Sequence, residues 1–368
     1  MWVESQRLAG VLVLNSPSSA NLPLVSVTVV CYNHSRYLQR CVNSLRAQDY
    51  TNIEIIFIDN ASTDGSQSML ASMPNVRLIA NKKNIGFSAA QNLGIESAAG
   101  EWILCLNPDT RLEPSFISEL VCAGMLDHRV GIVCPKIRRM REDGTTADPP
   151  LLDSTGVYFT PFLRHHDRGS QQPDIGQFDT PQYVFGYTGA AVLFRRTMIA
   201  DVSIEGEFMD VDFFFFREDA DVSWRAQLMG WRCVYTPFAV GYHVRTVFEN
   251  NRASVSALIN MHSTKNRFIM RIKNITPRVY WKVLLPTTIR DLGIFAYVLC
   301  RERSSISGLL WIVKNWRKTW RKRRWVQARV KVSSSEIEFW FNRHPMAKPL
   351  EAEYLAKLCH VKRICQAS

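Results

Sequence analysis

Polar residues follow each of four apolar runs in the first third of the chain. They are Tyr32-Asn33-His34, the segment from Asp59 to Gly65, the segment from Asn81 to Asn84, and Asn107-Pro108-Asp109. Carboxylate and amide groups of this kind suit a nucleotide that is held by its base and ribose while a divalent cation neutralises its diphosphate. Neither G-x-G-x-x-G after the first run nor G-x-x-x-x-G-K-[ST] occurs, so the glycine-rich phosphate loops are excluded. The pattern indicates a nucleotide-sugar site.

A second group of reactive side chains lies in the stretch 210–225, which begins Asp-Val-Asp-Phe-Phe-Phe-Phe-Arg-Glu-Asp-Ala-Asp. A carboxylate in such a cluster can act as a general base. The structural alternative is that acidic residues at the start of a helix favour its dipole. The residues alone leave both interpretations open.

The elements that must position these residues alternate regularly. Short β-branched runs at 25–31, 53–59, 76–80 and 102–106 are separated by amphipathic stretches at 36–47, 65–73, 86–99 and 115–126. This order predicts a mostly parallel sheet covered on both faces, with ligands bound beyond the carboxyl ends of its strands. Residues 138–183 are rich in Pro, Gly and Asp and predict a loop-dominated insertion. Apolar pattern returns at 187–195 and 231–235.

Four ordered motifs carry a family resemblance. They are VTVVCYN at 27–33, IDNASTDGS at 58–66, NIGFSAAQNLG at 84–94 and LNPDT at 106–110. Together they resemble the family 2 inverting glycosyltransferases of GT-A fold, nearest to the rhamnosyltransferase-like branch, over about residues 25–335. The resemblance implies an α/β fold of the GT-A (nucleotide-diphospho-sugar transferase) type, with a mostly parallel central sheet and, after it, a basic helical C-terminal segment.

The resemblance also implies a donor site. Asp59 would accept the imide N–H of a uracil or thymine, and Asn33 would line the same pocket. The further nucleotide-sugar-binding residues are Tyr32, Asn84, Gly86, Asn92, Asn107 and Gly189. Structural alternatives remain open at three of these positions: an Asx turn at Asn33, a solvent-facing Asn92 and simple packing at Gly189.

Metal and base residues follow from the same resemblance. Asp109 lies in the metal motif and would bind Mg²⁺ or Mn²⁺, while phosphates and waters complete the octahedron. His243 matches a histidine near the diphosphate or metal, although a lone histidine is often structural. Asp219 is the predicted catalytic base, with Glu218 as second choice, because inversion by direct displacement needs one carboxylate opposite the leaving group. Val211 and Phe216 replace the usual Glu and Tyr, which weakens any inference about the acceptor.

The basic charge is concentrated near the C-terminus. Lys and Arg exceed Asp and Glu by 12 in the whole chain, and the excess lies in residues 264–332. Leu309, Ile312, Val313, Trp316 and Trp320 recur at helical spacing, with Lys and Arg between them. We expect a basic amphipathic helix on an anionic membrane surface, the alternative being a packed helix with a solvated face. No nucleic-acid-reading motif occurs, so a nucleic-acid partner is not expected.

Apolar segments, cysteines and histidines bear on where in the cell the protein is expected. The apolar run at 283–300 is interrupted by Arg290 and Asp291, and no export signal precedes residue 25, so neither a transmembrane helix nor secretion is expected. Nine Cys without a C-x-x-C pair predict buried free thiols in a reducing compartment. His165-His166 is too isolated for a structural metal site. The protein is expected in the cytoplasm, peripheral on the inner face of the cell membrane.

Four parts are expected along the chain: an N-terminal extension (1–24), a GT-A domain (25–262), basic amphipathic helices that associate with the membrane (263–332) and a helical tail (333–368). The predicted activity is metal-dependent, inverting transfer of a hexose from a nucleoside-diphosphate sugar donor to a hydroxyl of an envelope glycan or lipid-linked saccharide acceptor. L-Rhamnose is the hexose that the branch implies. The alternative is a catalytically degenerate protein that only binds a nucleotide sugar or glycan.

Overall fold

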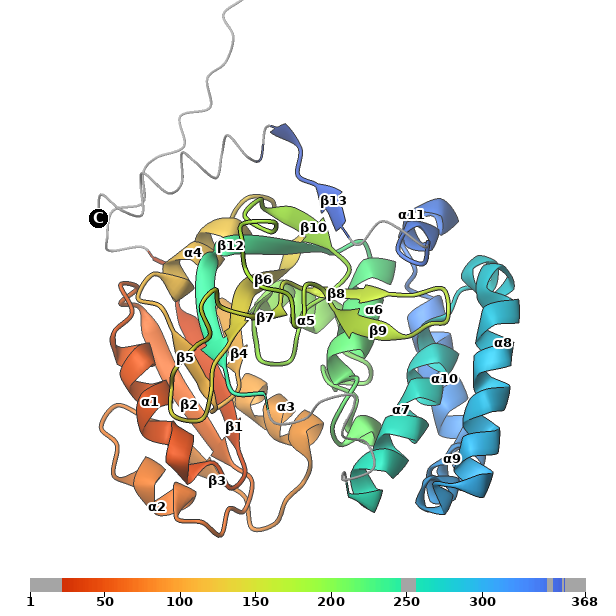
Figure 1. Cartoon of the computed structure of the whole chain (residues 1–368), viewed down its shortest axis with the longest axis horizontal. Helices are drawn as coiled ribbons and strands as arrows, with labels where there is room; N and C mark the ends of the chain where they lie inside the picture. The colour runs from red at the N-terminus through yellow and green to blue at the C-terminus, as the bar shows by residue number, and fades with distance from the viewer. Residues whose placement is uncertain (1–21, 246–255, 343–346, 353, 355–368) are drawn as a thin grey trace, which may run out of the picture.

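The computed structural model describes residues 22–245, 256–342, 347–352 and 354 (Figure 1). Its first strands and helices come in the predicted order: β1 (Val25–Cys31), α1 (Ser35–Arg46), β2 (Ile53–Asp59), α2 (Ser66–Ala71), β3 (Arg77–Ala80), α3 (Phe87–Ser97) and β4 (Trp102–Leu106). Strand β1 pairs in parallel with both β2 and β4, and β2 pairs in parallel with β3. The predicted GT-A type α/β architecture is confirmed for this half of the sheet.

The second half of the sheet mixes strand directions. The elements that follow β4, up to residue 243, are β5 (Thr110–Leu112), α4 (Phe116–Gly124), β6 (Val130–Arg139), β7 (Leu152–Ser154), β8 (Val157–Phe159), β9 (His165–Asp167), β10 (Gln182–Val184), β11 (Ala191–Arg195), α5 (Arg196–Val202), the 3-10 turn η2 (Val211–Phe213), α6 (Glu218–Leu228) and β12 (Arg232–His243), and the sheet also includes the late strand β13 (Ala347–Pro349). Strands β8 and β9 pair with each other as a separate two-stranded sheet. The strand order is β13-β10-β12-β6-β11-β4-β1-β2-β3, with β5 on β12 and β7 on β6. Strand β11 is antiparallel to both β4 and β6. The insertion predicted as loops therefore also supplies short strands, β7 to β10.

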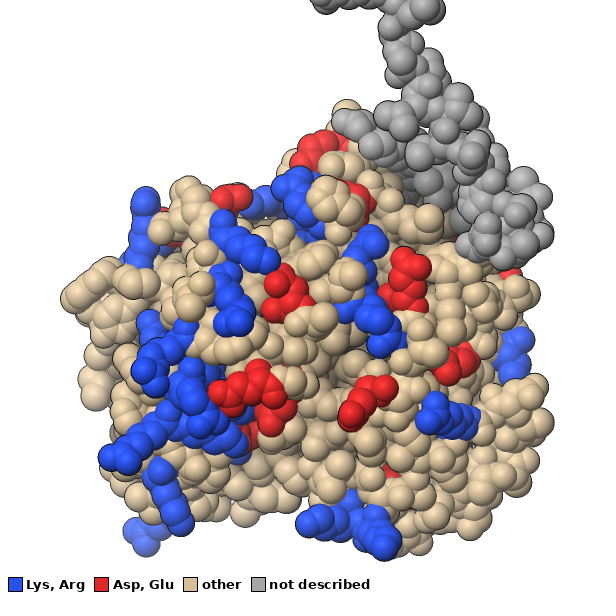
Figure 2. All heavy atoms as spheres, turned by 180° about the vertical axis from the view of Figure 1, so that it is seen from behind, with Lys and Arg blue, Asp and Glu red and all other residues tan. Residues whose placement is uncertain are grey.

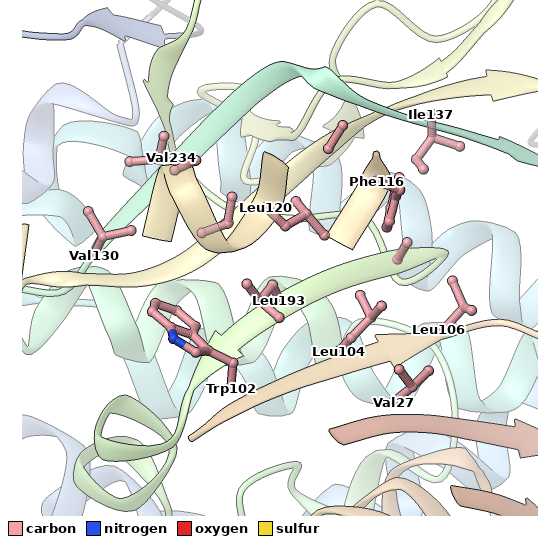
Figure 3. Packing of buried hydrophobic residues seen from close by; sticks show 14 of the residues in the cluster. Val27, Trp102, Leu104, Leu106, Phe116, Leu120, Val130, Ile137, Leu193 and Val234 are labelled. Carbon is pink, nitrogen blue, oxygen red and sulfur yellow. The ribbon is translucent and has the colours of Figure 1, made fainter. Parts of the chain in front are cut away.

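A hydrophobic core packs between the sheet and helix α4. Leu104, Leu193 and Val234 point from the sheet toward Phe116 and Leu120 of α4 (Figure 3). All five side chains are fully buried, and burial of each such group contributes about 1.5–3 kcal/mol. This frame holds the carboxyl ends of the central strands in constant positions.

The C-terminal segment is a set of helices: α7 (Ala257–Asn274), α8 (Pro277–Cys300), the turn η4 (Arg303–Ser305), α9 (Ile306–Lys314), α10 (Trp316–Gln327) and α11 (Ser334–Phe339). The expected single amphipathic helix is interrupted at Asn315, which ends α9 and precedes α10. The expected domain boundary after residue 262 falls inside α7. Of the helices in the described ranges, α8 is the one whose length and composition would allow it to cross a membrane.

Helices α7 and α10 reach the acidic stretch through buried lysines. Lys273 pairs with Asp210 and lies 3.0 Å from Asp221, and both carboxylates are almost completely buried. Lys322 lies 2.6 Å from Asp210 and 2.9 Å from Asp212, with 3% of its side chain exposed. Burial alone would raise the pKa of Asp210, but the two ammonium groups lower it. Lys322, expected on the basic outer face, instead points inward because these carboxylates compensate its charge.

The cysteines of the described ranges are free, as predicted. Six of them are buried: Cys31, Cys41, Cys105, Cys122, Cys134 and Cys233. Cys300 differs from the prediction because it is exposed at the end of α8. Cys359 and Cys365 lie outside the described residues, as do most of the expected N-terminal extension and the end of the expected tail.

The buried lysines give a stability prediction. Lys273→Ala should lower the free energy of unfolding by about 3–5 kcal/mol, because it leaves Asp210 and Asp221 buried without their shared cation. Lys314→Ala is the matched control, since Lys314 is exposed on α9 and should change stability by less than about 0.5 kcal/mol. Urea denaturation followed by circular dichroism measures both. Equal midpoints for the two variants would contradict the role assigned to Lys273.

Candidate active site

Asp59 lies at the carboxyl end of β2, opposite Cys31 at the end of β1 and Ala80 at the end of β3. Its side chain is fully buried, and its Oδ2 accepts a hydrogen bond from the backbone N–H of Ser62 at 3.1 Å. Its Oδ1 is buried and has no hydrogen-bond partner among the described residues. A free acceptor at a strand end can receive one N–H from a ligand, such as the imide of a pyrimidine base.

Asn33 joins the end of β1 to the loop after β2. Its Oδ1 accepts from the backbone N–H of Thr63 at 2.8 Å, and its own N–H donates to Ser62 Oγ at 3.0 Å. It adopts a φ of 58°, as an Asx-type turn allows. The side chain of Asn33 thus serves the turn, while the neighbouring Tyr32 is 44% exposed at the same strand end.

Asn60 is a buried residue that the sequence reasoning did not single out, although it stands next to Asp59 in the second motif. Its Nδ2 donates to Asn84 Oδ1 at 2.8 Å, and its Oδ1 accepts from the N–H of Ile85 at 3.1 Å. These bonds hold the predicted donor loop against β2. Gly86 follows with a φ of 86°, and a Cβ there would lie 2.5 Å from the ring of Phe214. The donor loop therefore touches the aromatic part of the acidic stretch.

The other predicted donor residues separate into two places. Asn92 exchanges hydrogen bonds of 2.7 and 2.8 Å with the backbone of Met209, so it positions the segment before Asp210 rather than lying beside Asp59. Asn107 donates its N–H to the carbonyl of Ala190 at 2.9 Å, which brings Gly189 next to the metal motif. A Cβ on Gly189 would meet no atom within 4 Å, so this position borders open space.

Asp109 and His243 meet because β5 pairs with β12. His243 lies opposite Thr110 in this antiparallel register, and the N–H of Val244 donates to the carbonyl of Asp109 at 3.1 Å. Asp109 Oδ1 and His243 Nε2 are 3.3 Å apart, and this Oδ1 is buried without a hydrogen-bond partner among the described residues. Adjacent ligands of an octahedral cation with bonds of about 2.1 Å have a similar spacing, so the pair fits a shared Mg²⁺ or Mn²⁺.

Asp153, from the insertion, orients His243 and was missed by the sequence reasoning. Its Oδ2 lies 2.9 Å from His243 Nδ1, and its Oδ1 accepts from Arg245 at 3.1 Å. A carboxylate on Nδ1 fixes the imidazole with Nε2 toward the open side. Burial opposes protonation of His243, but Asp109 and Asp153 raise the pKa of its imidazole to about 10. A cation at Nε2 would have to displace this proton.

The donor phosphates would have to complete any cation site. No group of three or more His, Cys, Asp and Glu side chains in the part of the chain that the structure describes is arranged to hold a metal. A cavity of about 570 Å³ is lined by Val244 and Arg245, which directly follow His243 at the end of β12. Its lining also includes Arg139, Arg141 and Glu142, so three arginines face one carboxylate. Such a positive wall suits a diphosphate that brings its own oxygen ligands to the cation.

The five carboxylates of the acidic stretch divide into two groups. Asp210, Asp212 and Asp221 form ion pairs with lysines of the C-terminal helices, and Asp221 also pairs with Arg225 at 3.0 Å. Glu218 and Asp219 form no ion pair with another described residue. Three of the five carboxylates therefore hold the C-terminal helices against the acidic stretch. The two predicted base candidates, Glu218 and Asp219, are not used in this way.

Glu218 and Asp219 form the first turn of α6. Glu218 Oε2 is buried without a hydrogen-bond partner among the described residues, whereas Asp219 Oδ1 accepts from the N–H of Ala220 at 2.7 Å. Burial and the neighbouring Asp219 raise the pKa of Glu218 to about 8. Burial raises the pKa of Asp219 to about 6 against the effect of the Ala220 N–H. Burial thus raises the pKa of both carboxyl groups, and Glu218 is raised further, so Asp219 is the member that releases its proton more readily, which suits a proton acceptor.

The chain is similar in sequence to known glycosyltransferases. Residues 26–202 match the family described as "Glycosyl transferase family 2". The chain is 28% identical over 302 residues to an N-acetylglucosaminyl-diphospho-decaprenol L-rhamnosyltransferase of Mycobacterium tuberculosis (strain ATCC 25618 / H37Rv), a match over 76% of this chain and 93% of that protein. It is 32% identical over 136 residues to EpsH of Bacillus subtilis (strain 168), and it spans 39% of the length of that relative.

Two solved structures share the fold. The crystal structure of S. aureus TarS 1-349 in complex with UDP-GlcNAc has a TM-score of 0.51 at 16% identity, over 94% of this chain and 91% of that one. The crystal structure of GalNAc-T7 with UDP, GalNAc and Mn²⁺ has a TM-score of 0.53 at 16% identity, over 69% of this chain and 48% of that one. At such low identity these likenesses concern the fold alone.

The Asp109–His243 pair leads to a metal prediction. Asp109→Ala should weaken the binding of UDP or TDP about 10- to 100-fold when Mn²⁺ is present, because the cation loses its carboxylate ligand. In EDTA the variant and the unmodified protein should bind these nucleotides equally weakly. Glu96→Ala, an exposed carboxylate on α3, is the control and should behave like the unmodified protein. Calorimetric titration provides the readout, and metal-independent binding by the unmodified protein would refute the assignment.

Proposed function

Residues 26–202 of this chain are a family 2 glycosyltransferase domain of GT-A fold, and from this premise we propose that the protein is a metal-dependent, inverting hexosyltransferase. Its donor would be a nucleoside-diphosphate sugar, and its acceptor a hydroxyl of an envelope glycan or of a lipid-linked saccharide. The relative from Mycobacterium tuberculosis supports L-rhamnose as the transferred hexose and a lipid-linked acceptor, since it is an N-acetylglucosaminyl-diphospho-decaprenol L-rhamnosyltransferase.

One observation carries the proposal. Three carboxylate oxygens in the described residues are buried without a hydrogen-bond partner, and they belong to Asp59, Asp109 and Glu218. Buried polar groups are normally paired, so each such oxygen calls for an explanation. A donor nucleotide would supply the missing partner at Asp59 and a cation the one at Asp109, and an acceptor saccharide bound at Asp219 would bring a hydroxyl within reach of the neighbouring Glu218. A protein that only binds nucleotide sugar would need the first two but not the third.

Each residue of the candidate site has a separate role in the proposed reaction. Asp59 would hold the base of the donor, and Asp109 and His243 would hold the cation at its diphosphate. When bound, Mg²⁺ or Mn²⁺ stabilises the charge that grows on the departing nucleoside diphosphate. Asp219 would take the proton of the acceptor hydroxyl while that oxygen bonds to the anomeric carbon and the bond to the diphosphate breaks. Attack from the side opposite the leaving group inverts the anomeric configuration.

The proposal also includes the subcellular location of the enzyme. A lipid-linked acceptor is carried by a membrane, and the excess of Lys and Arg in residues 264–332 favours an anionic surface. We therefore place the protein in the cytoplasm at the inner face of the cell membrane, as a peripheral enzyme.

The base assignment predicts a kinetic result. Asp219→Asn keeps the shape of the side chain but removes the proton acceptor, so kcat should fall about 10²- to 10⁴-fold. Donor affinity should stay within about twofold, as measured by calorimetry with the nucleoside diphosphate and Mn²⁺. Glu218→Gln is the matched neighbour and should cost less, because burial and Asp219 raise the pKa of Glu218 and make it the poorer proton acceptor. A fully active Asp219→Asn protein would refute the role of Asp219; loss of donor affinity would place this carboxylate at the donor instead.

The raised pKa of Asp219 predicts a pH profile. The base works only when it is ionised, so kcat/KM should fall as the pH drops through about 6. An ordinary exposed aspartate would remain ionised down to about pH 4. Rates of nucleotide release between pH 5 and 8, with circular dichroism as a control for unfolding, test this expectation. A rate that is flat down to pH 5 would contradict it.

A further inference from the structure

Helix α8 presents an uncharged stripe away from the rest of the protein. Five large side chains on it recur at intervals of three to seven residues and are each between 60% and 72% exposed: Trp281, Leu285, Ile289, Leu292 and Leu299. Thr288 and Ala296 complete the same face of the helix. Helical residues at such intervals share one face, so the stripe is continuous along the helix.

The two charges that interrupt this run in the sequence do not lie on the stripe. Asp291 pairs with both Nη atoms of Arg271 on α7, at 3.0 and 2.5 Å, and both side chains are 16% exposed. Arg290 donates to the carbonyl of Phe162 at 2.7 Å. Both residues therefore turn toward the protein. In the sequence these two charges argued against a transmembrane helix, but they leave the exposed face of α8 uncharged.

The same contacts tie α8 to the globular body. Besides the pair between Arg271 and Asp291, Phe295 stacks on Phe268 of α7 with ring centroids 5.5 Å apart. Lys282 lies 2.7 Å from Glu338 of α11. A helix that crossed a bilayer would have to break these contacts or carry their charges into hydrocarbon, which is costly. The arrangement favours a helix that lies along a surface.

Charge next to the stripe identifies the surface. Lys and Arg crowd one side of the rear face, where the C-terminal helices lie (Figure 2). The exposed cationic residues of α9 and α10 include Lys314, Arg317 and Arg324. Two copies of such a face would repel each other, whereas an anionic lipid surface is complementary to it.

We infer that α8 lies in the plane of an anionic bilayer, with its uncharged stripe at the boundary between headgroups and acyl chains. The inference rests on the proposed function, in which the membrane carries the acceptor. It moves the main membrane contact from Trp316 and Trp320, which stack on each other at 5.2 Å, to α8.

The position of α8 brings the lipid surface close to the base. Helix α7 lies between α8 and the acidic stretch, and Asn266 on α7 donates to the carbonyls of Phe213, Phe215 and Phe216 at 2.8–2.9 Å. Phe216 is two residues from Glu218. An acceptor head group that leaves the bilayer beside α8 would therefore reach Asp219 past α8 and α7.

Flotation with lipid vesicles tests the inference. The full chain should float with vesicles of phosphatidylcholine and phosphatidylglycerol, and Leu285→Glu with Leu292→Glu should reduce the bound fraction at least tenfold. The matched control is Ile175→Glu with Met125→Glu, two exposed apolar residues outside the C-terminal helices, which should float like the unmodified protein. Alkaline carbonate should release the unmodified protein, as expected for a helix that does not cross the bilayer.

Other results would overturn the inference. Undiminished flotation of the α8 variant would show that the stripe does not touch lipid, and resistance to carbonate would indicate a crossing helix. A lipid-free dimer that the α8 substitutions dissociate, seen by sedimentation, would make a second copy the occupant. If the double variant unfolds by circular dichroism, the single variants Leu285→Ser and Leu292→Ser give the same comparison. Nucleotide release with a soluble acceptor should be equal in the α8 variant; its absence in all variants would defeat the proposed function while flotation still decides the inference.

Discussion

Carboxylate oxygens held out of water without partners are the constraint on which this structure depends. A buried acceptor without a hydrogen-bond partner costs about 1–3 kcal/mol, so it persists only where a well-packed frame holds it in place. The sheet and its core supply this frame at Asp59 and Asp109, and the first turn of α6 supplies it at Glu218. The raised pKa values of Glu218 and Asp219 are the visible result of that burial. A ligand that brings N–H groups, a cation or a hydroxyl relieves the same cost, which links binding to the fold.

The frame also explains how distant parts of the chain meet. Parallel strands bring Asp59 and Asp109 to one edge, but the antiparallel β5–β12 register brings His243 there, and the insertion adds Asp153 through β7. The loop at Gly86 and the ring of Phe214 then join the donor side to the acidic stretch. The candidate site is assembled from strand ends, one register and one inserted strand.

The sequence predicted the parts of this site that local pattern encodes. A β-branched run that stops at a polar residue marks the end of a strand, and this pattern located Asp59 and Asp109. Asp153 could not be found in this way, because its role comes from its contact with His243, which lies 90 residues further along the chain. The directions of Lys322 and Asp291 were equally hidden, since helical spacing shows which residues share a face but not which face meets a buried partner. Asn315 was not recognised as the end of a helix, because the apolar spacing continues across it.

The buried lysines of α7 and α10 have a consequence for how this chain can change in evolution. Lys273 and Lys322 share Asp210, and each holds a further carboxylate of the acidic stretch. Loss of any one of these lysines or carboxylates leaves a partner's charge buried without compensation. Single substitutions in either segment should therefore be selected against, whereas paired substitutions in both segments should be tolerated. The acidic stretch and the C-terminal helices should thus be inherited together, and chimaeras between related enzymes should keep both from the same parent.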